Sequence, residues 1–199
     1  MGEELVRVLK RKNRNANLTQ IDISKKHLDE NKNKETTKIV GDVLKVDLQK
    51  KFDVVIMRSS LPYFPSVALK VKLLNRIHDW LKRGGVFIHQ VSTADTEKDK
   101  KMIDYIYGPL FKMGVKGYST RYDILSLYQM SGFARIQRIG KAPTLFVSEK
   151  EHQARYGTTQ KEIRQIQAKI RKSDKVKNVI WTKRGYRLTF PFSIYVTYR

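Results

Sequence analysis

The sequence predicts an α/β fold in which a mostly parallel sheet carries helices on both faces. Apolar, β-branched runs at 17–24, 36–40, 52–57 and 85–92 alternate with amphipathic segments such as 66–82, and such alternation is typical of parallel sheets. Two aromatic runs near the C-terminus flank Lys183-Arg184-Gly185, which predicts an antiparallel hairpin there. We therefore divide the chain into a core at 1–148, a basic helical insertion at 149–177 and a C-terminal hairpin at 178–199 that completes the sheet.

The individual elements follow from residue type. "FDVVIM" at 52–57 is apolar and β-branched, so we expect a strand that is buried on both faces. The next segment carries an apolar stripe at helical spacing, and Gly84-Gly85 follows it, which predicts a helix over 66–82 that ends at the glycines. Helices are also predicted over 97–113, 119–131 and 149–172.

Composition excludes several classes of protein. There is no cysteine, which rules out disulfides and thiolate metal sites. The four histidines have no metal-ligand spacing, so we expect no metal. No apolar stretch approaches the ~20 residues that a membrane span needs, and the N-terminus has no signal-peptide pattern. We expect a soluble, cytoplasmic protein that does not bind membranes.

The net charge is +22, from 41 Lys and Arg against 19 Asp and Glu. Such an excess favours polyanionic partners, RNA among them, through counterion release. A general lysine bias that serves solubility is the alternative. The region 149–199 combines 13 basic with only 4 acidic residues, so it is the better candidate for a contact surface.

Acidic residues end two of the predicted strands. Asp22 closes the first, Gly41-Asp42 closes the second, and "FDVVIM", a helix, "LKRGG" and "VFIHQ" follow in that order. The ordered set resembles the class I S-adenosylmethionine-dependent methyltransferases over about residues 2–140. The resemblance implies a Rossmann-like fold in which Asp22 binds the cofactor's ribose, Ile23 contacts the adenine, and Asp42 with Val43 lies near the adenine amino group.

The N-terminus departs from that family. Gly2 lies twenty residues before Asp22 and matches the last glycine of the family's cofactor loop, since an acid is expected ~20 residues beyond such a turn. The resemblance therefore implies that the fold is N-terminally incomplete, without the first strand and most of the loop. The strands ending at Asp22 and Met57 would then lose a shared partner or pair with each other. Three explanations are consistent with this N-terminus: a truncated gene, a misplaced start codon, or an enzyme that has lost its activity.

The segment "RSSLPYFP" follows the third predicted strand, where acceptor chemistry is expected. Its Ser60-Leu61-Pro62-Tyr63 is similar to the N-L-P-Y motif of ribosomal RNA adenine dimethyltransferases, with serine in place of the amide. The general sequence pattern of the class I methyltransferases fits this segment without a gap, and we prefer that alignment. We place Ser59, Ser60 and Tyr63 on the acceptor side, although a tyrosine that covers the core is the commoner role. His89 is a candidate proton acceptor or, preferably, a core histidine.

The basic insertion predicts a second surface. An apolar stripe of Ile163, Ile166 and Ile170 would dock a helix on the body of the protein, and basic side chains surround it. A basic helix followed by aromatic residues could hold a phosphate backbone and offer stacking faces, while a solvated helix is the alternative. The predicted nucleic-acid contacts are Lys161, Arg164, Lys169, Arg171, Lys172, Lys175, Lys177 and Trp181.

Three functional hypotheses remain. The leading one is an S-adenosylmethionine-dependent methyltransferase, or a truncated form of one, whose acceptor is undetermined and for which nucleic acid is weakly favoured. The second is an inactive methyltransferase-like fold that serves as a basic nucleic-acid-binding or interaction module. The third is a nicotinamide-binding domain, since Asp22 could hold that ribose too, but "LKRGG" and the closing hairpin speak against it.

Overall fold

The computed structural model describes residues 2–12, 16–98, 100–101, 104, 118–172, 179–182 and 185–199. Contacts within the chain divide it into two compact units, Met1–Gln49 and Lys50–Arg199. The division falls in the loop between the second and third strands. Each unit is described by itself.

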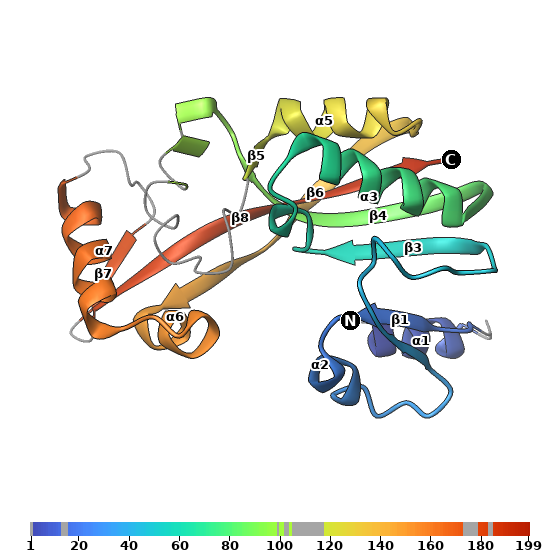
Figure 1. Cartoon of the computed structure of the whole chain (residues 1–199), viewed down its shortest axis with the longest axis horizontal. Helices are drawn as coiled ribbons and strands as arrows, with labels where there is room; N and C mark the ends of the chain where they lie inside the picture. Colours follow the sequence, from blue (N-terminus) through green and yellow to red (C-terminus); the bar gives the residue numbers. More distant parts are fainter. Residues whose placement is uncertain are drawn as a thin grey trace. The chain divides into compact units, whose positions relative to one another are not determined.

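The first unit is a small parallel α/β element (Figure 1). It contains α1 (Gly2–Arg11), β1 (Thr19–Asp22), α2 (Lys25–Asp29) and β2 (Thr37–Val40). The two strands pair in parallel from Thr19 opposite Thr37 to Asp22 opposite Val40. Their carboxyl ends therefore lie side by side.

The second unit is built on a mixed sheet with the strand order β3-β4-β8-β6. It contains β3 (Phe52–Arg58), η1 (Leu61–Tyr63), α3 (Val67–Trp80), β4 (Leu81–Ala94), β5 (Ser119–Thr120), α5 (Arg121–Met130), β6 (Ala134–Ser148), α6 (Glu149–Tyr156), α7 (Gln160–Lys172), β7 (Val179–Thr182) and β8 (Gly185–Tyr198). β4 pairs in parallel with β3 and β5, whereas β8 pairs antiparallel with β4, β6 and β7. The predicted α/β class with antiparallel C-terminal strands is confirmed.

Helix capping explains where the helices over this sheet begin. Ser66 Oγ accepts a hydrogen bond from Leu69 N at 3.2 Å at the start of α3. A reciprocal capping box starts α5, in which Thr120 N donates to Asp123 Oδ2 at 2.7 Å and Asp123 N donates to Thr120 Oγ1 at 3.1 Å. Each arrangement satisfies backbone donors that would otherwise lack a partner.

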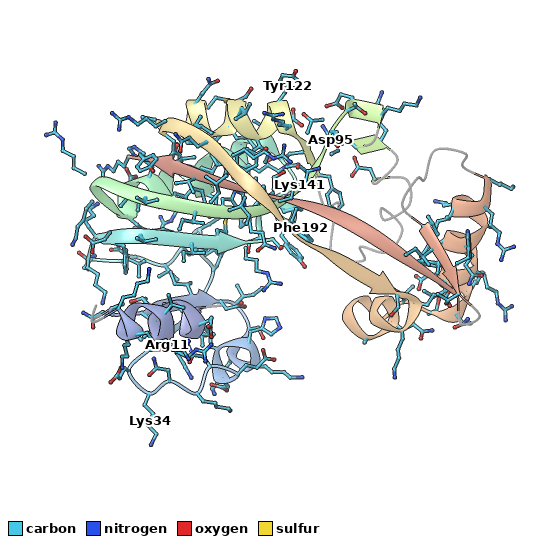
Figure 2. The ribbon with its side chains drawn as sticks, turned by 180° about the vertical axis from the view of Figure 1, so that it is seen from behind. Arg11, Lys34, Asp95, Tyr122, Lys141 and Phe192 are labelled. Atoms are coloured by element: carbon cyan, nitrogen blue, oxygen red, sulfur yellow. The ribbon has the colours of Figure 1, made fainter. Side chains whose placement is uncertain are left out.

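The core of the second unit lies between the sheet and these two helices. Leu73, Leu74 and Ile77 of α3 are buried, as are Ile124 and Tyr128 of α5. On the outer side of α5, Tyr122 points away from the sheet (Figure 2) and is 77% exposed. α3 and α5 therefore cover one face of β4 with their apolar sides.

Two sequence expectations about single elements are wrong. The helix over 66–82 ends at Trp80, and Lys82 to Gly85 belong to β4, which begins at Leu81. Leu81 is already extended, with ψ at 144°, and Gly84 adopts a φ of +74° that other residues disfavour. β3 is not buried on both faces either, since none of its residues is fully buried and Val54 is 44% exposed.

The exposure of β3 follows from its pairing. Among the described residues, β3 pairs only with β4, and β1 pairs only with β2. Each of these two strands is therefore an edge of the sheet in its own unit. An edge strand leaves one row of backbone donors and acceptors open.

Candidate functional site

The predicted cofactor residues lie at the carboxyl ends of β1 and β2. Asp22 is the last residue of β1, and Ile23 follows it. Gly41 N donates a hydrogen bond to Asp22 O at 3.0 Å, so Asp42 directly follows a residue that is bonded to the end of β1. Ligands of open α/β sheets bind at this edge.

Asp22 is oriented by its own loop. Ser24 N donates to Asp22 Oδ1 at 2.8 Å, and Ser24 Oγ accepts from His27 N at 3.3 Å as the N-cap of α2. Asp22 Oδ2 lies 3.5 Å from His27 Nδ1, and the two side chains are 37% and 64% exposed. One carboxylate oxygen is therefore fixed by the backbone, while the other faces a solvent-exposed imidazole.

The neighbours of Asp22 supply an apolar surface and a second carboxylate. Ile23 is 74% exposed, so it offers an aliphatic surface directly after the strand end. Asp42 Oδ1 accepts from Leu44 N at 2.9 Å, and this local turn leads through half-buried Val43. A Cβ on Gly41 would lie 2.7 Å from Val46 Cγ2, so glycine allows the turn to close tightly.

Gly2 is the first residue of α1, as the resemblance implies for the end of a cofactor loop. The helix is tied to its unit by an ion pair of 2.7 Å between Lys10 Nζ and Glu35 Oε2. Gly2 therefore opens a helix in the same unit as Asp22 and Asp42.

This set of side chains fits an adenosine. Vicinal ribose hydroxyls and an exocyclic amine are donors that match carboxylate acceptors, and a flat, largely apolar base matches an exposed aliphatic surface. Asp22, Ile23 and Asp42 offer these features at one edge of one sheet.

The predicted acceptor residues lie at the carboxyl end of β3 in the second unit. Ser59 N donates to Gln90 O at 2.8 Å, and Ser59 adopts a φ of +54°, a region that non-glycine residues disfavour. Ser60 Oγ donates to Arg58 O at 3.0 Å. Tyr63 is 62% exposed beside buried Leu61 and Pro62, so its roles on the acceptor side and as a cover of the core both stay predictions.

His89 is a core histidine, as preferred from the sequence. It is fully buried in β4, its ring stacks on Phe87 with centroids 5.3 Å apart, and its Nδ1 lies 2.7 Å from Tyr128 Oη. Burial lowers the pKa of His89 from 6.5 to about 3. A base of this kind is neutral and inaccessible at neutral pH, which contradicts the proton-acceptor alternative.

Sequence reasoning missed several polar residues. His27 was not connected with Asp22, although the "DISKKH" spacing places both at one helix N-terminus. Lys70 of α3 is 5% exposed, and its Nζ donates to Ser119 Oγ at 3.0 Å. Burial lowers the pKa of Lys70, an effect that Asp123 partly opposes. No local pattern marks Lys70, because only the packing of α3 on β5 and α5 buries it.

The predicted nucleic-acid contacts gather on α7 and β7. Lys161, Arg164, Arg171 and Lys172 are exposed on α7 and Lys169 is half-buried, while the three isoleucines of the stripe are buried. Trp181 lies on β7 and is 43% exposed. Lys175 and Lys177 lie outside the described residues.

The described residues hold neither a metal-binding cluster nor a helix that could span a membrane. No group of three His, Asp or Glu residues among them is placed to hold a metal ion. Likewise, none of the helices in the described part of the chain is long and apolar enough to cross a membrane.

Comparisons with known proteins bear on the fold. Residues 2–89 match the family model described as a methyltransferase domain, a range that includes every predicted cofactor residue. The chain has a methyltransferase fold. No curated protein matches it in sequence.

Solved structures extend the similarity of fold over nearly the whole chain. YcgJ of Bacillus subtilis aligns with a TM-score of 0.75 and 14% identity, over 91% of this chain and 81% of YcgJ. BH2331 of Bacillus halodurans C-125, described as a candidate methyltransferase, aligns with a TM-score of 0.78 and 12% identity, over 99% of this chain and 88% of BH2331. PigF, solved with S-adenosylhomocysteine, aligns at 0.59 and 12% identity, over all of this chain and 47% of PigF.

Proposed function

We propose that this methyltransferase fold binds S-adenosylmethionine at the carboxyl ends of β1 and β2 and transfers its methyl group. The family match, together with the S-adenosylhomocysteine in PigF, indicates this cofactor. The observation that carries the proposal is the oriented carboxylate of Asp22 beside the exposed side chain of Ile23. A ribose diol and the adenine attached to it need these two features side by side.

Each residue has a distinct part in the proposed site. Asp22 accepts hydrogen bonds from the ribose hydroxyls through the oxygen that Ser24 leaves open. Ile23 packs against one face of the adenine, and Asp42 accepts from its amino group. His27 Nδ1 lies 3.5 Å from Asp22 Oδ2, so the imidazole borders the proposed site.

Methyl transfer from this cofactor requires little chemistry from the side chains of the protein. The bound cofactor supplies a methyl group that is already activated on a sulfonium sulfur, so the protein contributes mainly by positioning the acceptor and excluding water. Ser59, Ser60 and Tyr63 offer hydroxyl groups at the carboxyl end of β3 for acceptor contacts. The excess of positive charge favours nucleic acid as the acceptor.

A transfer assay tests this function. The chain is incubated with methyl-labelled S-adenosylmethionine and with RNA, protein or small-molecule fractions as acceptors. We expect label in the RNA fraction, loss of transfer in D22N, and wild-type transfer in D29N. Asp29 is a suitable control because it lies in the same unit and its carboxylate forms an exposed ion pair with Lys25, which is worth little.

The outcomes separate the two leading hypotheses. Transfer that survives in D22N would contradict the assignment of the cofactor site. Cofactor binding without transfer to any fraction would favour an inactive methyltransferase fold that serves as a basic nucleic-acid-binding module. The basic surface of α7 and β7 supports that second candidate.

A further inference from the structure

The most basic part of the second unit is a surface formed by α7 and β7. We define the α7–β7 surface as the exposed side chains Lys161, Arg164, Arg171, Lys172 and Trp181. In Figure 1, α7 and β7 lie at the end of the β6–β8 ribbon that is remote from α3 and α5. The surface is therefore separate from the residues after β3 that were placed on the acceptor side.

The orientation of α7 is fixed by its apolar side. Ile163, Ile166 and Ile170 are 0%, 1% and 4% exposed, so the helix is held with the basic side chains directed outward. Lys161 and Lys172 are eleven residues apart on one helix, a rise of about 16 Å. The surface thus presents a basic strip rather than a point charge.

Arg171 and Trp181 form a preorganised pair on this strip. The guanidinium carbon of Arg171 lies 4.6 Å from the centroid of the Trp181 ring. That ring also meets the edge of Tyr186 at 6.2 Å, and Tyr186 is only 1% exposed. A guanidinium that is held over an aromatic face keeps its N–H groups free in its own plane, which suits bidentate contact with a phosphate.

Two of the described acidic side chains close to the strip, Glu149 and Glu162, have other partners. Glu162 accepts from Thr159 N at 2.7 Å and from Thr159 Oγ1 at 2.8 Å, as part of the start of α7. Glu149 accepts from Gln167. Among the residues that the structure describes, no carboxylate forms an ion pair with Lys161, Arg164, Arg171 or Lys172. Their charges therefore remain available to a polyanion.

We propose that the α7–β7 surface binds single-stranded nucleic acid. Arg171 and its basic neighbours contact successive phosphates, and the open part of Trp181 provides a stacking face for a base. An anionic membrane would be attracted by the same charges. However, the isoleucines of α7 are buried, so the helix offers no apolar face of the kind that inserts into a bilayer.

The proposal is independent of cofactor binding. To test it, the affinity for a labelled 12-nucleotide single-stranded RNA is measured by fluorescence anisotropy at KCl concentrations from 50 to 300 mM. Four phosphate contacts predict a slope of log K against log salt of about −3, at about −0.7 per contact. R164Q/R171Q is expected to flatten the slope by about 1.4 and to weaken binding at least about tenfold.

Matched variants distinguish RNA binding at the α7–β7 surface from attraction of RNA to the net charge of the protein. R121Q/R138Q removes the same charge from exposed positions on α5 and β6 and is expected to bind like the wild type. R171K keeps the charge but loses the planar fork, so we expect weaker binding with an unchanged slope. D22N is expected to bind RNA like the wild type, which keeps this result distinct from failure of the cofactor site.

Three results would overturn the proposal. R121Q/R138Q could weaken binding as much as R164Q/R171Q, which would mean that net charge alone attracts RNA. R171K could bind like the wild type, which would remove the role of the Arg171–Trp181 pair. Phosphatidylserine vesicles could bind where the RNA does not, which would make the partner a membrane surface.

Discussion

The buried imidazole of His89 makes the stability of the second unit sensitive to acid. Its pKa is lowered from 6.5 to about 3 because burial disfavours the charged form. Between these two values the unfolded chain binds a proton that the folded chain does not, so unfolding becomes easier as the pH falls. From pH 8 to pH 5 the loss of free energy of unfolding from this group is about 2 kcal/mol, and from pH 8 to pH 3 it is about 4 kcal/mol.

The perturbation that isolates this effect is H89F, measured by urea unfolding at pH 8 and pH 5. H89F removes the titrating group but keeps an aromatic ring in the stack with Phe87. The Tyr128 hydroxyl loses its partner at 2.7 Å, which lowers stability by about 1–3 kcal/mol at both pH values. We therefore expect H89F to lose about 2 kcal/mol less than the wild type between pH 8 and pH 5.

Y128F is the matched control. It removes the hydrogen bond to His89 Nδ1 but leaves the ring that helps to bury the imidazole. Since burial is the cause of the pKa shift, Y128F should keep the pH dependence of the wild type while being less stable at each pH. The reasoning is refuted if H89F and the wild type lose the same stability between pH 8 and pH 5.

Two further pairs of variants test local features of the second unit by urea unfolding at pH 8. S59G should raise stability by about 0.5–1 kcal/mol, because Ser59 has a φ of +54°. S60G should not raise it, since Ser60 has a φ of −93°; equal gains at both positions would contradict the strain argument. T120V should cost about 1 kcal/mol by removing a cap of α5. T197V should leave stability nearly unchanged, because the buried Thr197 hydroxyl has no partner among the described residues. An equal loss of stability in T120V and T197V would contradict the capping explanation.

Much of the fold could be predicted from local pattern. The strand ending at Asp22, the strand before Gly41 and the antiparallel hairpin around Gly185 all appear in the structure. Periods of apolar residues and the chemistry of glycine turns determine these features, and both are visible in one sequence. The positions of Asp22 and Asp42 at strand ends could likewise be predicted, because strand ends can be read along the chain; their part in cofactor binding stays a prediction.

Features that depend on distant packing could not be predicted. "FDVVIM" has the composition of a strand that is buried on both faces, yet β3 is an edge strand of its sheet. The exposure of a strand depends on which strands flank it, and its own residues do not reveal that. The burial of Lys70 and the contact between His89 and Tyr128 also join residues far apart in the sequence. Composition showed that α7 is basic, but only the structure places Arg171 over Trp181.

The central claim is that Asp22 and its neighbours form a cofactor site. It is tested most directly by calorimetric titration of the chain with S-adenosylhomocysteine, beside D22A and the control D29A. The account predicts about micromolar binding by the wild type and by D29A, and none by D22A. Absence of binding by the folded wild type, or equal binding by D22A, would contradict it.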